Sequence, residues 1–520
     1  MMKDIWYAIV DKIKTIRRSS IYSFYTTIIV GLVIHITVWV THLVNHDSVS
    51  LLNNDLYNVQ PFTEGKWLSS VLILLRGSFV SSGVSVPQAL ILIAFSSAFL
   101  VSILDIKNVT SGIAIGILMV SMPTVFCIFS YQGYSFFFAL FLSILSVYIY
   151  VRCKHGFILG VLVCTLSLAI YQAYIGFTAS ILLGLCIISI FNANNTIKFL
   201  LKKGIGYIIF LGCSIGLYYL VLQVILRISN INLSSYRNIN EMTNFSLGEI
   251  PNILGDTYEK VVLFFVKDEY GTGGFIVTFF FKMIIFLSII MLIYIIVQSK
   301  LYKNVSKIIL LAILLMLLPF SVHAIAILGM SANTHWIMMY PFVMIFVLVV
   351  KGWDYILPFA RKKSMKILVL GILLSVLGIT YEWSKSANFS YDRLRLAYEN
   401  AFSASVQLAA DIRANNEYNS NMEIAFVGNE EYPVFAKTIK YYERLDNFTG
   451  IEDASHVLHD NRDVASFLDI YVGLDFIPVD NTVAEELNKN VDVRRMNIYP
   501  SYGSIAVMDD ILIVKLSEVE

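Results

Sequence analysis

The stretch IYSFYTTIIVGLVIHITVWVTHLV, residues 21–44, decides the fold class. It contains no Asp, Glu, Lys or Arg, and about 20 mainly apolar residues are enough for a helix to cross a bilayer. It is too long for the apolar core of a signal peptide, and no small-residue cleavage site follows it. We therefore expect a retained membrane span close to the N-terminus.

The rest of the chain has the same character. Of its 520 residues, 57% are hydrophobic and only 14% are charged, and the mean hydropathy is +0.71. Soluble globular chains carry roughly 25% charged residues. Residues 1–381 hold 13 acids and 26 bases, whereas residues 382–520 hold 24 acids and 12 bases. This asymmetry predicts two domains, a basic membrane domain at 1–381 and an acidic, water-soluble domain at 382–520.

Apolar runs predict a mainly α fold, a polytopic helical bundle with eleven spans, at residues 21–44, 86–104, 109–129, 133–151, 156–170, 174–191, 205–226, 274–298, 307–328, 335–350 and 366–381. With this count, five basic stretches share one side, at residues 3–20, 151–156, 197–204, 298–307 and 360–366. Lys and Arg gather in cytoplasmic loops. We therefore expect a cytoplasmic N-terminus, and an extracytoplasmic side that holds the loops at 45–85, 227–273 and 329–334 and the C-terminal domain.

Three further patterns refine this topology. Residues 67–80 and 249–266 suit helices that lie in the membrane interface. In the C-terminal domain, a helical period precedes MEIAFVG, a buried strand that ends at Gly428, and SIAVMDDILIVKL predicts a hairpin. We expect a small α/β domain there. The five cysteines lie in or beside apolar segments, so they offer neither a disulfide framework nor a metal site.

Nine of the thirteen acids of the membrane domain lie in the predicted outer loops, and almost none lies in the middle of a span, where proton-coupled transporters carry acids. The first outer loop, HDSVSLLNNDLYNVQPFTEGKW at 46–67, holds three of them: Asp47, Asp55 and Glu64. A carboxylate beside the membrane could act as the general base for a sugar hydroxyl. Each acid also has a plainer interpretation: Asp55 as a solvated loop residue, Asp47 as part of a helix terminus, and Glu64 as a turn residue.

A lipid phosphate leaving group would need nearby cations or hydrogen-bond donors. Lys66, Arg76 and Arg237 are at a suitable depth, although Arg76 could simply extend to the head groups. Trp67 could stack on a sugar ring or belong to the interfacial aromatic belt. Tyr171 and Gln172 interrupt a long apolar run, and they could line a cavity or only cap a short helix.

His323, Asn333 and His335 lie around the outer ends of two spans. Two histidines twelve positions apart make a weak metal pattern. Hydrogen bonding to a phosphate or sugar, or a purely structural role, is the alternative.

Together, the acid-bearing first outer loop NNDLYNVQPFTEGKW, the interruption SLAIYQAYIGF and the polar C-terminal domain resemble the Gtr-type serotype-converting glucosyltransferases of bacteria and their phages. Those enzymes belong to the GT-C class of membrane glycosyltransferases. The resemblance covers roughly residues 20–381.

The resemblance implies a polyprenyl-phosphate sugar donor, undecaprenyl-phosphate glucose above all, and a hydroxyl acceptor on O-antigen or another surface glycan. It also implies inversion at the anomeric centre and a place in the bacterial inner membrane. The essential acid of the class matches Asp55 best and then Asp47, and a basic residue that meets the lipid phosphate matches Arg76. No cofactor is expected: a divalent cation is compatible with this chemistry, but no ligand pattern indicates one, and nothing points to nucleic acid.

Two other functions fit a multi-span chain. A translocator of lipid-linked glycans would need polar residues along several spans and pseudo-symmetric halves, and neither is visible. A membrane acyltransferase would need an intramembrane site that faces a cytoplasmic donor, which suits the outer histidines poorly.

Overall fold

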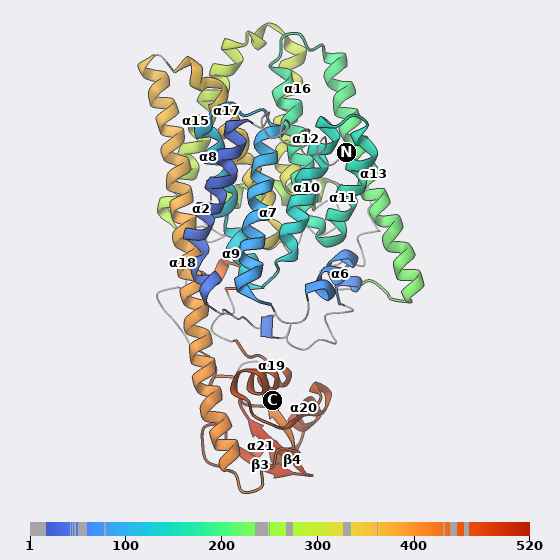
Figure 1. The fold of residues 1–520 in the computed structure, drawn as a ribbon, viewed down its shortest axis with the longest axis vertical. Coiled ribbons are helices and arrows are strands. Elements are labelled where there is room, and N and C mark those ends of the chain that lie inside the picture. Colours follow the sequence, from blue (N-terminus) through green and yellow to red (C-terminus); the bar gives the residue numbers. More distant parts are fainter. Residues whose placement is uncertain are drawn as a thin grey trace, which may run out of the picture.

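A long helical bundle and a smaller C-terminal domain make up the chain (Figure 1). The computed structural model describes residues 17–41, 43, 45, 48–49, 60–76, 80–234, 248, 250–266, 274–325, 334–360, 362–429, 432–436, 445–451 and 457–519. Among these residues, ten helical segments are long and apolar enough to cross a membrane. An eleventh apolar helix, α11 (Gly156–Ile170), has 15 residues. The predicted polytopic bundle is confirmed, and the short helix α11 coincides with the predicted span at residues 156–170.

Successive spans of the bundle run in alternating directions along its long axis (Figure 1). Their bounds are α2 (Arg18–Val40), α7 (Ser82–Ile103), α8 (Val109–Ser121), α9 (Pro123–Ser130), α10 (Ser135–Arg152), α11, α12 (Ile175–Ile190), α13 (Ile197–Ser229), α15 (Phe275–Gln298), α16 (Val305–Val322), α17 (Val343–Ile356) and the first part of α18 (Lys363–Ala414). Pro123 separates α8 from α9, since proline has no N–H and disfavours helical backbone in the residue before it.

Short elements complete the bundle at its ends. The helices α5 (Gln60–Thr63), α6 (Trp67–Arg76) and α14 (Ile250–Phe265) lie in the segments predicted as outer loops. Helices α6 and α14 fall within the segments 67–80 and 249–266, for which helices were predicted, and their place in the membrane interface stays a prediction. Single turns of tighter helix are η1 (Gln172–Tyr174), η5 (Leu301–Lys303), η7 (Trp336–Met338), η8 (Tyr340–Phe342) and η9 (Leu357–Phe359).

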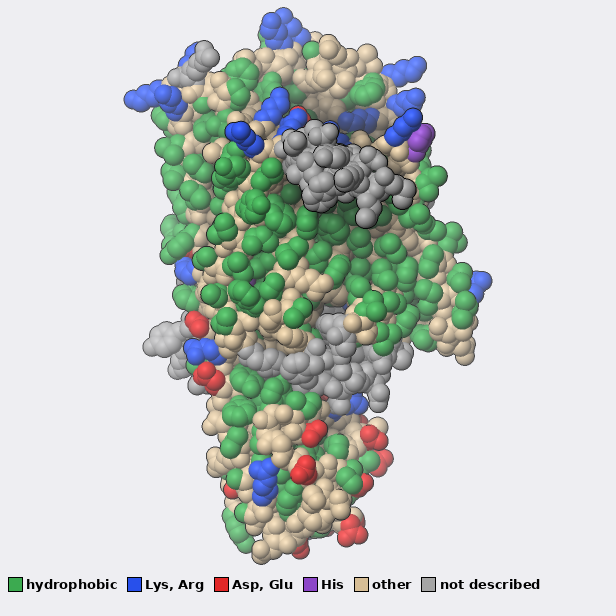
Figure 2. All heavy atoms as spheres, in the orientation of Figure 1, with side chains coloured by type: hydrophobic (Ala, Val, Ile, Leu, Met, Phe, Trp, Pro, Cys, Tyr) green, Lys and Arg blue, Asp and Glu red, His purple; other side chains and the backbone are tan. Residues whose placement is uncertain are grey.

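Charge is distributed along the long axis of the molecule (Figure 2). Lys and Arg side chains gather at the end of the bundle opposite the C-terminal domain, a broad apolar band follows, and acidic side chains lie on the C-terminal domain. The turns at the basic end join α7 to α8, α10 to α11, α12 to α13, α15 to α16 and α17 to α18. The four predicted basic stretches that lie between helices, at residues 151–156, 197–204, 298–307 and 360–366, therefore share one end in the part of the chain that the structure describes, and most of the fifth, at residues 3–20, lies outside that part.

Helix α18 joins the two parts of the molecule. It has 52 residues and runs without a break through the predicted domain boundary at 381–382. The predicted span at 366–381 and the helix predicted before MEIAFVG are thus one helix, because no Gly or Pro occurs between Tyr381 and Ala414 to end it. Up to Leu394 its buried side chains pack into the core of the bundle, and from Ala397 onward they pack into the core of the C-terminal domain.

The C-terminal domain is a small α/β unit. Its sheet has the strand order β2-β1-β4-β3, made of β1 (Glu423–Val427), β2 (Ile477–Pro478), β3 (Ile505–Met508) and β4 (Ile511–Lys515). Strand β1 is parallel to β2 and β4, and β3 is antiparallel to β4. The predicted hairpin turns at Asp509 and Asp510, both in the left-handed region. Helices α19 (Asn461–Phe467), α20 (Asn481–Asn488), α21 (Val491–Arg495) and the wider turn η11 (Leu468–Val472) complete it.

The start of the first outer loop lies between the two parts. Gln132 donates from Nε2 to the carbonyl of Leu43 over 3.1 Å, which fixes the chain to the bundle. Six residues further on, Val49 is fully buried in the core of the C-terminal domain. The loop that carries the predicted catalytic acids therefore begins at the junction of both parts.

Candidate functional site

The segment from Pro61 to Trp67 makes a tight connection at the end of the bundle that faces the C-terminal domain (Figure 1). After α5, the N–H groups of Gly65 and Lys66 donate back to the carbonyls of Phe62 and Pro61. Gly65 has φ +72°, a left-handed conformation that closes short helices and favours glycine. An added Cβ there would lie 2.7 Å from the Tyr218 hydroxyl oxygen, so glycine is also required by space.

Two side chains, one from η1 and one from α13, hold this turn. Gln172 donates from Nε2 to the Glu64 carbonyl over 2.9 Å and to the Tyr218 hydroxyl oxygen over 3.0 Å. The Tyr218 hydroxyl in turn donates to the carbonyl of Gly65 over 2.9 Å. Both side chains are buried, so this network replaces the water that would otherwise solvate the turn. The interruption at Tyr171 and Gln172 thus binds the first outer loop.

Glu64 and Lys66 form an ion pair inside this turn. The Glu64 side chain is 10% exposed and that of Lys66 is 21% exposed. The Lys66 ammonium also lies 5.5 Å from the ring centre of Tyr171 and 5.9 Å from that of Phe136. These two rings stack with centroids 4.2 Å apart. Cation–π attraction and the carboxylate together fix the ammonium in place.

Helix α6 begins directly after this turn and carries polar atoms that lack a partner. The Trp67 indole N–H and the Ser70 hydroxyl are buried, and neither has a hydrogen-bond partner in the part of the chain that the structure describes. Three residues apart on a helix, the two side chains share a face. Since buried polar groups are normally hydrogen-bonded, these two donors have unmet hydrogen-bonding capacity beside the turn, within the described part of the chain.

A second polar cluster, the His323 cluster, consists of Thr257, Lys260, His323 and Thr334. His323 is 1% exposed; its Nδ1 lies 3.3 Å from the Thr257 hydroxyl and its Nε2 lies 2.9 Å from the Thr334 hydroxyl. Lys260, on α14, donates from Nζ to the same Thr334 oxygen over 2.6 Å. The cluster joins α14 to the outer end of α16.

The protonation states of this cluster follow from burial. Burial, assisted by the charge of Lys260, lowers the pKa of His323 from 6.5 to about 3, so the imidazole is neutral. Burial also lowers the pKa of Lys260, although Asp256 and Glu259 oppose this change. A neutral His323 can donate from Nδ1 to Thr257 and accept at Nε2 from the Thr334 hydroxyl, while Lys260 donates to Thr334. No ion pair involves Lys260 among the described residues.

The residues around the turn at 61–67 (Glu64, Lys66, Tyr171, Gln172 and Tyr218) form a first polar cluster. Helix α12 connects this cluster to the His323 cluster. Tyr174, which ends η1, contacts the ring of Tyr340 at 6.0 Å between centroids. Gly176 fits so closely beneath Pro341 that an added Cβ would lie 2.8 Å from that ring and 2.8 Å from the Val322 carbonyl oxygen. Val322 precedes His323, so α12, which directly follows η1 in the chain, packs beside the His323 cluster.

The C-terminal domain touches the same region. Phe448 packs against Phe126 and Trp336, with centroids 4.9 Å and 5.2 Å apart. The backbone N–H of Trp336 donates to the Thr449 hydroxyl oxygen over 3.0 Å. Trp336 follows His335, which places the predicted residue His335 at the contact between the bundle and the C-terminal domain.

The structure brings together Glu64, Lys66, Tyr171 and Gln172, and it places Trp67 at the start of the adjoining helix. His323 belongs to the other cluster. Four predicted residues lie outside the described residues: Asp47, Asp55, Arg237 and Asn333. Arg76 ends α6, and its side chain lies outside the description too.

Sequence reasoning missed Tyr218, Thr257, Lys260 and Thr334. Lys260 offered a signal, because it is a basic residue within the amphipathic segment that was predicted to lie in the interface. Tyr218 offered none, since a tyrosine in a span is more often an ordinary packing residue. Among the described residues, no three His, Cys, Asp or Glu side chains meet in a way that could hold a metal ion.

The fold and these clusters define a multi-pass membrane protein with buried polar groups at one end of a helical bundle. A family model described as glucosyl transferase GtrII matches residues 40–350, which is more than half of the chain and includes both clusters. The chain belongs to the GtrII glucosyl transferase family and is a membrane glucosyltransferase. Searches of curated proteins and of solved structures each found no significant match.

Proposed function

We propose that the protein transfers glucose from a polyprenyl-phosphate carrier to a hydroxyl group of O-antigen or another surface glycan, on the extracytoplasmic side of a bacterial inner membrane. The observation that carries this proposal is the family match over residues 40–350, a range that contains the whole first outer loop and both polar clusters. The gathering of Lys and Arg at the opposite end supports this orientation (Figure 2).

The general base is best assigned to Asp55, with Asp47 as the second candidate. The third acid, Glu64, is already held in an ion pair with Lys66, so its carboxylate has a fixed partner within the turn. We therefore assign Glu64 a positioning role, in which it keeps Lys66 above the aromatic rings. In the sequence, Asp47 lies between Leu43 and Val49, which contact the bundle and the C-terminal domain respectively, and Asp55 follows Val49.

The lipid phosphate needs a cation whose charge is available. Lys66 has a carboxylate partner, whereas Lys260 is half-buried and, among the described residues, hydrogen-bonded to a neutral hydroxyl alone. Burial disfavours its charged form, and an anionic ligand would restore it. We therefore assign the phosphate to Lys260, with Arg76 and Arg237 as further candidates. The unpartnered Trp67 and Ser70 donors suit the sugar hydroxyls.

The experiment offers the purified protein several polyprenyl-phosphate sugars with surface glycan acceptors and follows donor consumption and glycan mass by mass spectrometry. We expect use of the glucose donor. Loss of a general base lowers rates by about 100-fold or more, so Asp55→Asn should abolish measurable transfer while expression and membrane insertion stay normal. Asp510→Asn, an equal change in an exposed turn of the C-terminal domain, is the control. Wild-type transfer by Asp55→Asn would refute the assignment.

Lys260 is tested in the same assay. Lys260→Ala should raise the KM for the lipid donor more than Lys260→Arg does, because arginine keeps the charge. Lys489→Ala, at an exposed position of the C-terminal domain, should leave the KM unchanged. Equal donor KM values for Lys260→Ala and the control would remove Lys260 from the phosphate site.

A further inference from the structure

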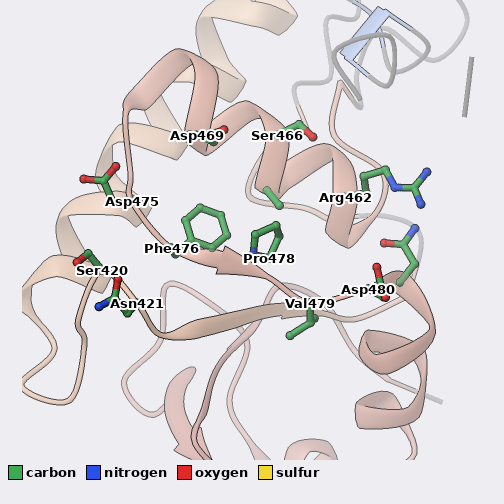
Figure 3. Close-up of a pocket in the computed structure, with 12 residues that line it drawn as sticks. Ser420, Asn421, Arg462, Ser466, Asp469, Asp475, Phe476, Pro478, Val479 and Asp480 are labelled. Carbon is green, nitrogen blue, oxygen red and sulfur yellow. The ribbon is translucent and has the colours of Figure 1, made fainter. Parts of the chain in front are cut away.

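A cavity of about 650 Å³ opens in the C-terminal domain (Figure 3), and no residue of either polar cluster lines it. It lies between β2 on one side and α19 with η11 on the other. Phe476 and Pro478 occupy its middle, Asp475 and Asn421 lie at one end, and Arg462 and Asp480 lie at the other. Its volume falls within the range of about 300–1,000 Å³ that is usual for small-molecule sites.

The charged side chains that line this cavity make no ion pair or side-chain hydrogen bond with other described residues. Its lining has three carboxylates, Asp469, Asp475 and Asp480, and one guanidinium, Arg462. Within the described residues, none of these four side chains forms an ion pair or a side-chain hydrogen bond. They are therefore available as hydrogen-bond acceptors and donors for a ligand.

The rim at one end is held in place independently of these groups. The Tyr418 hydroxyl donates to the Asp475 carbonyl over 2.6 Å, and Arg413 donates to the Gly473 carbonyl over 2.7 Å. At the other end, buried Asn461 donates from Nδ2 to the Val479 carbonyl over 2.8 Å. Backbone that is fixed before a ligand arrives costs less to order upon binding.

The chemistry of the lining selects among ligands. Three carboxylates against one guanidinium disfavour a phosphate or another anion. A peptide that added a strand at the free edge of β2 would find little to pair with, because β2 has two residues and Pro478 has no N–H. A sugar has hydroxyls that both donate and accept, and an apolar ring face that packs on an aromatic ring. Carboxylates, amides, a guanidinium and Phe476 match all of these features.

We propose that this cavity is a binding site for a neutral, hydroxyl-rich oligosaccharide, and that it holds the acceptor glycan while the membrane domain carries out transfer. The identification of the ligand as the acceptor rests on the proposed function. The order of groups along the cavity, polar at both ends with Phe476 and Pro478 between them, suits a chain of more than one sugar ring.

The test measures binding by the full-length protein in lipid nanodiscs, without donor, to an array of neutral and anionic bacterial surface oligosaccharides. We expect binding to neutral glycans. The double variant Asp469→Ala, Asp475→Ala should weaken this binding about tenfold or more, as loss of several hydrogen bonds implies. The control, Glu485→Ala with Asp492→Ala, removes two exposed acids of the same domain that do not line the cavity and should bind like the wild type.

Transfer kinetics separate this inference from the proposed function. The cavity variant should raise the KM for the acceptor and leave the KM for the lipid donor unchanged, and Asp55→Asn should bind glycan normally although it transfers none. Glycan binding without any transferase activity would keep the cavity site and remove the proposed function. No binding to the array, binding to anionic glycans alone, or equal binding by the cavity variant and its control would overturn the inference.

Discussion

Gly65 is a residue at which the first outer loop contacts the bundle at close range. Its left-handed backbone and the 2.7 Å approach of the Tyr218 oxygen to an added Cβ leave no room for a side chain. We expect Gly65→Ala to lower the free energy of unfolding by about 2 kcal/mol, from backbone strain and displacement of Tyr218. Thermal unfolding in detergent measures this loss, and transfer should fall with it.

Gly216 provides the matched control for this substitution. It lies in α13, like Tyr218, and an added Cβ there would meet nothing within 4 Å. Gly216→Ala should leave stability unchanged or slightly higher, because alanine is the better helix former. Equal losses at both glycines would show that the approach of Tyr218 to Gly65 has no energetic weight.

His323 makes stability depend on pH. The folded chain keeps it neutral with a pKa of about 3, whereas the unfolded chain protonates it below 6.5. Between these two values the unfolded state binds one more proton, so the free energy of unfolding falls as pH falls, by at most about 1.4 kcal/mol per pH unit. Above pH 6.5 the contribution is constant.

The measurement compares thermal unfolding at pH 7.5 and 5.5. The wild type should lose about 1 kcal/mol more than His323→Gln does over this interval. His155→Asn is the control, because His155 is exposed at the basic end and lies in the left-handed region that asparagine tolerates. A pH profile of His323→Gln that matches the wild type would contradict the neutral, buried imidazole.

At the scale of elements, a buried hydrogen bond connects α2 to α18. His35 Nδ1 on α2 lies 2.6 Å from the Tyr391 hydroxyl on α18, and His35 Nε2 lies 3.0 Å from the Val120 carbonyl of α8. Both side chains are fully buried. The contact fixes α18 at the level where its packing changes from the bundle to the C-terminal domain.

Tyr391→Phe removes this bond and leaves a buried ring nitrogen without a partner. The expected cost is about 1–3 kcal/mol of stability. Tyr381→Phe on the same helix removes a hydroxyl from a side chain that is 67% exposed and should cost nothing measurable. The measurement compares the thermal unfolding midpoints of the two variants. A midpoint of Tyr391→Phe equal to that of Tyr381→Phe would contradict the prediction.

At the scale of the whole molecule, the separation of charge along the long axis predicts the orientation in the membrane (Figure 2). Cys153 is exposed in the turn after α10, at the basic end. Tyr502 is 98% exposed in the C-terminal domain. These two positions therefore report on opposite sides of the membrane.

An impermeant maleimide applied to spheroplasts tests this orientation. Tyr502→Cys, in a chain with Cys153→Ser and Cys213→Ser, should react in intact spheroplasts. Native Cys153, with Cys213→Ser, should react after permeabilisation alone. The reverse pattern would place the C-terminal domain and the first outer loop in the cytoplasm, and the proposed function would be lost with them.

The fold class, the gathering of basic residues at one end and the strands around Gly428 and Asp509 followed from the sequence by itself, whereas eleven spans were predicted and ten helices of span length are found among the described residues. Each depends on the local period of apolar side chains or on nearby charge, which neighbouring residues report. The interruption at Tyr171 and Gln172 was visible for the same reason.

Only the tertiary structure decided that Gln172 and Tyr218 hold Gly65, that Lys66 is neutralised by Glu64 and that Lys260 meets His323 through Thr334. These contacts join residues up to 153 positions apart. The continuity of α18 through both cores and the cavity beside Phe476 were likewise decided by packing. Local sequence determines which segments are helical and apolar, whereas which polar side chains meet depends on how the helices pack.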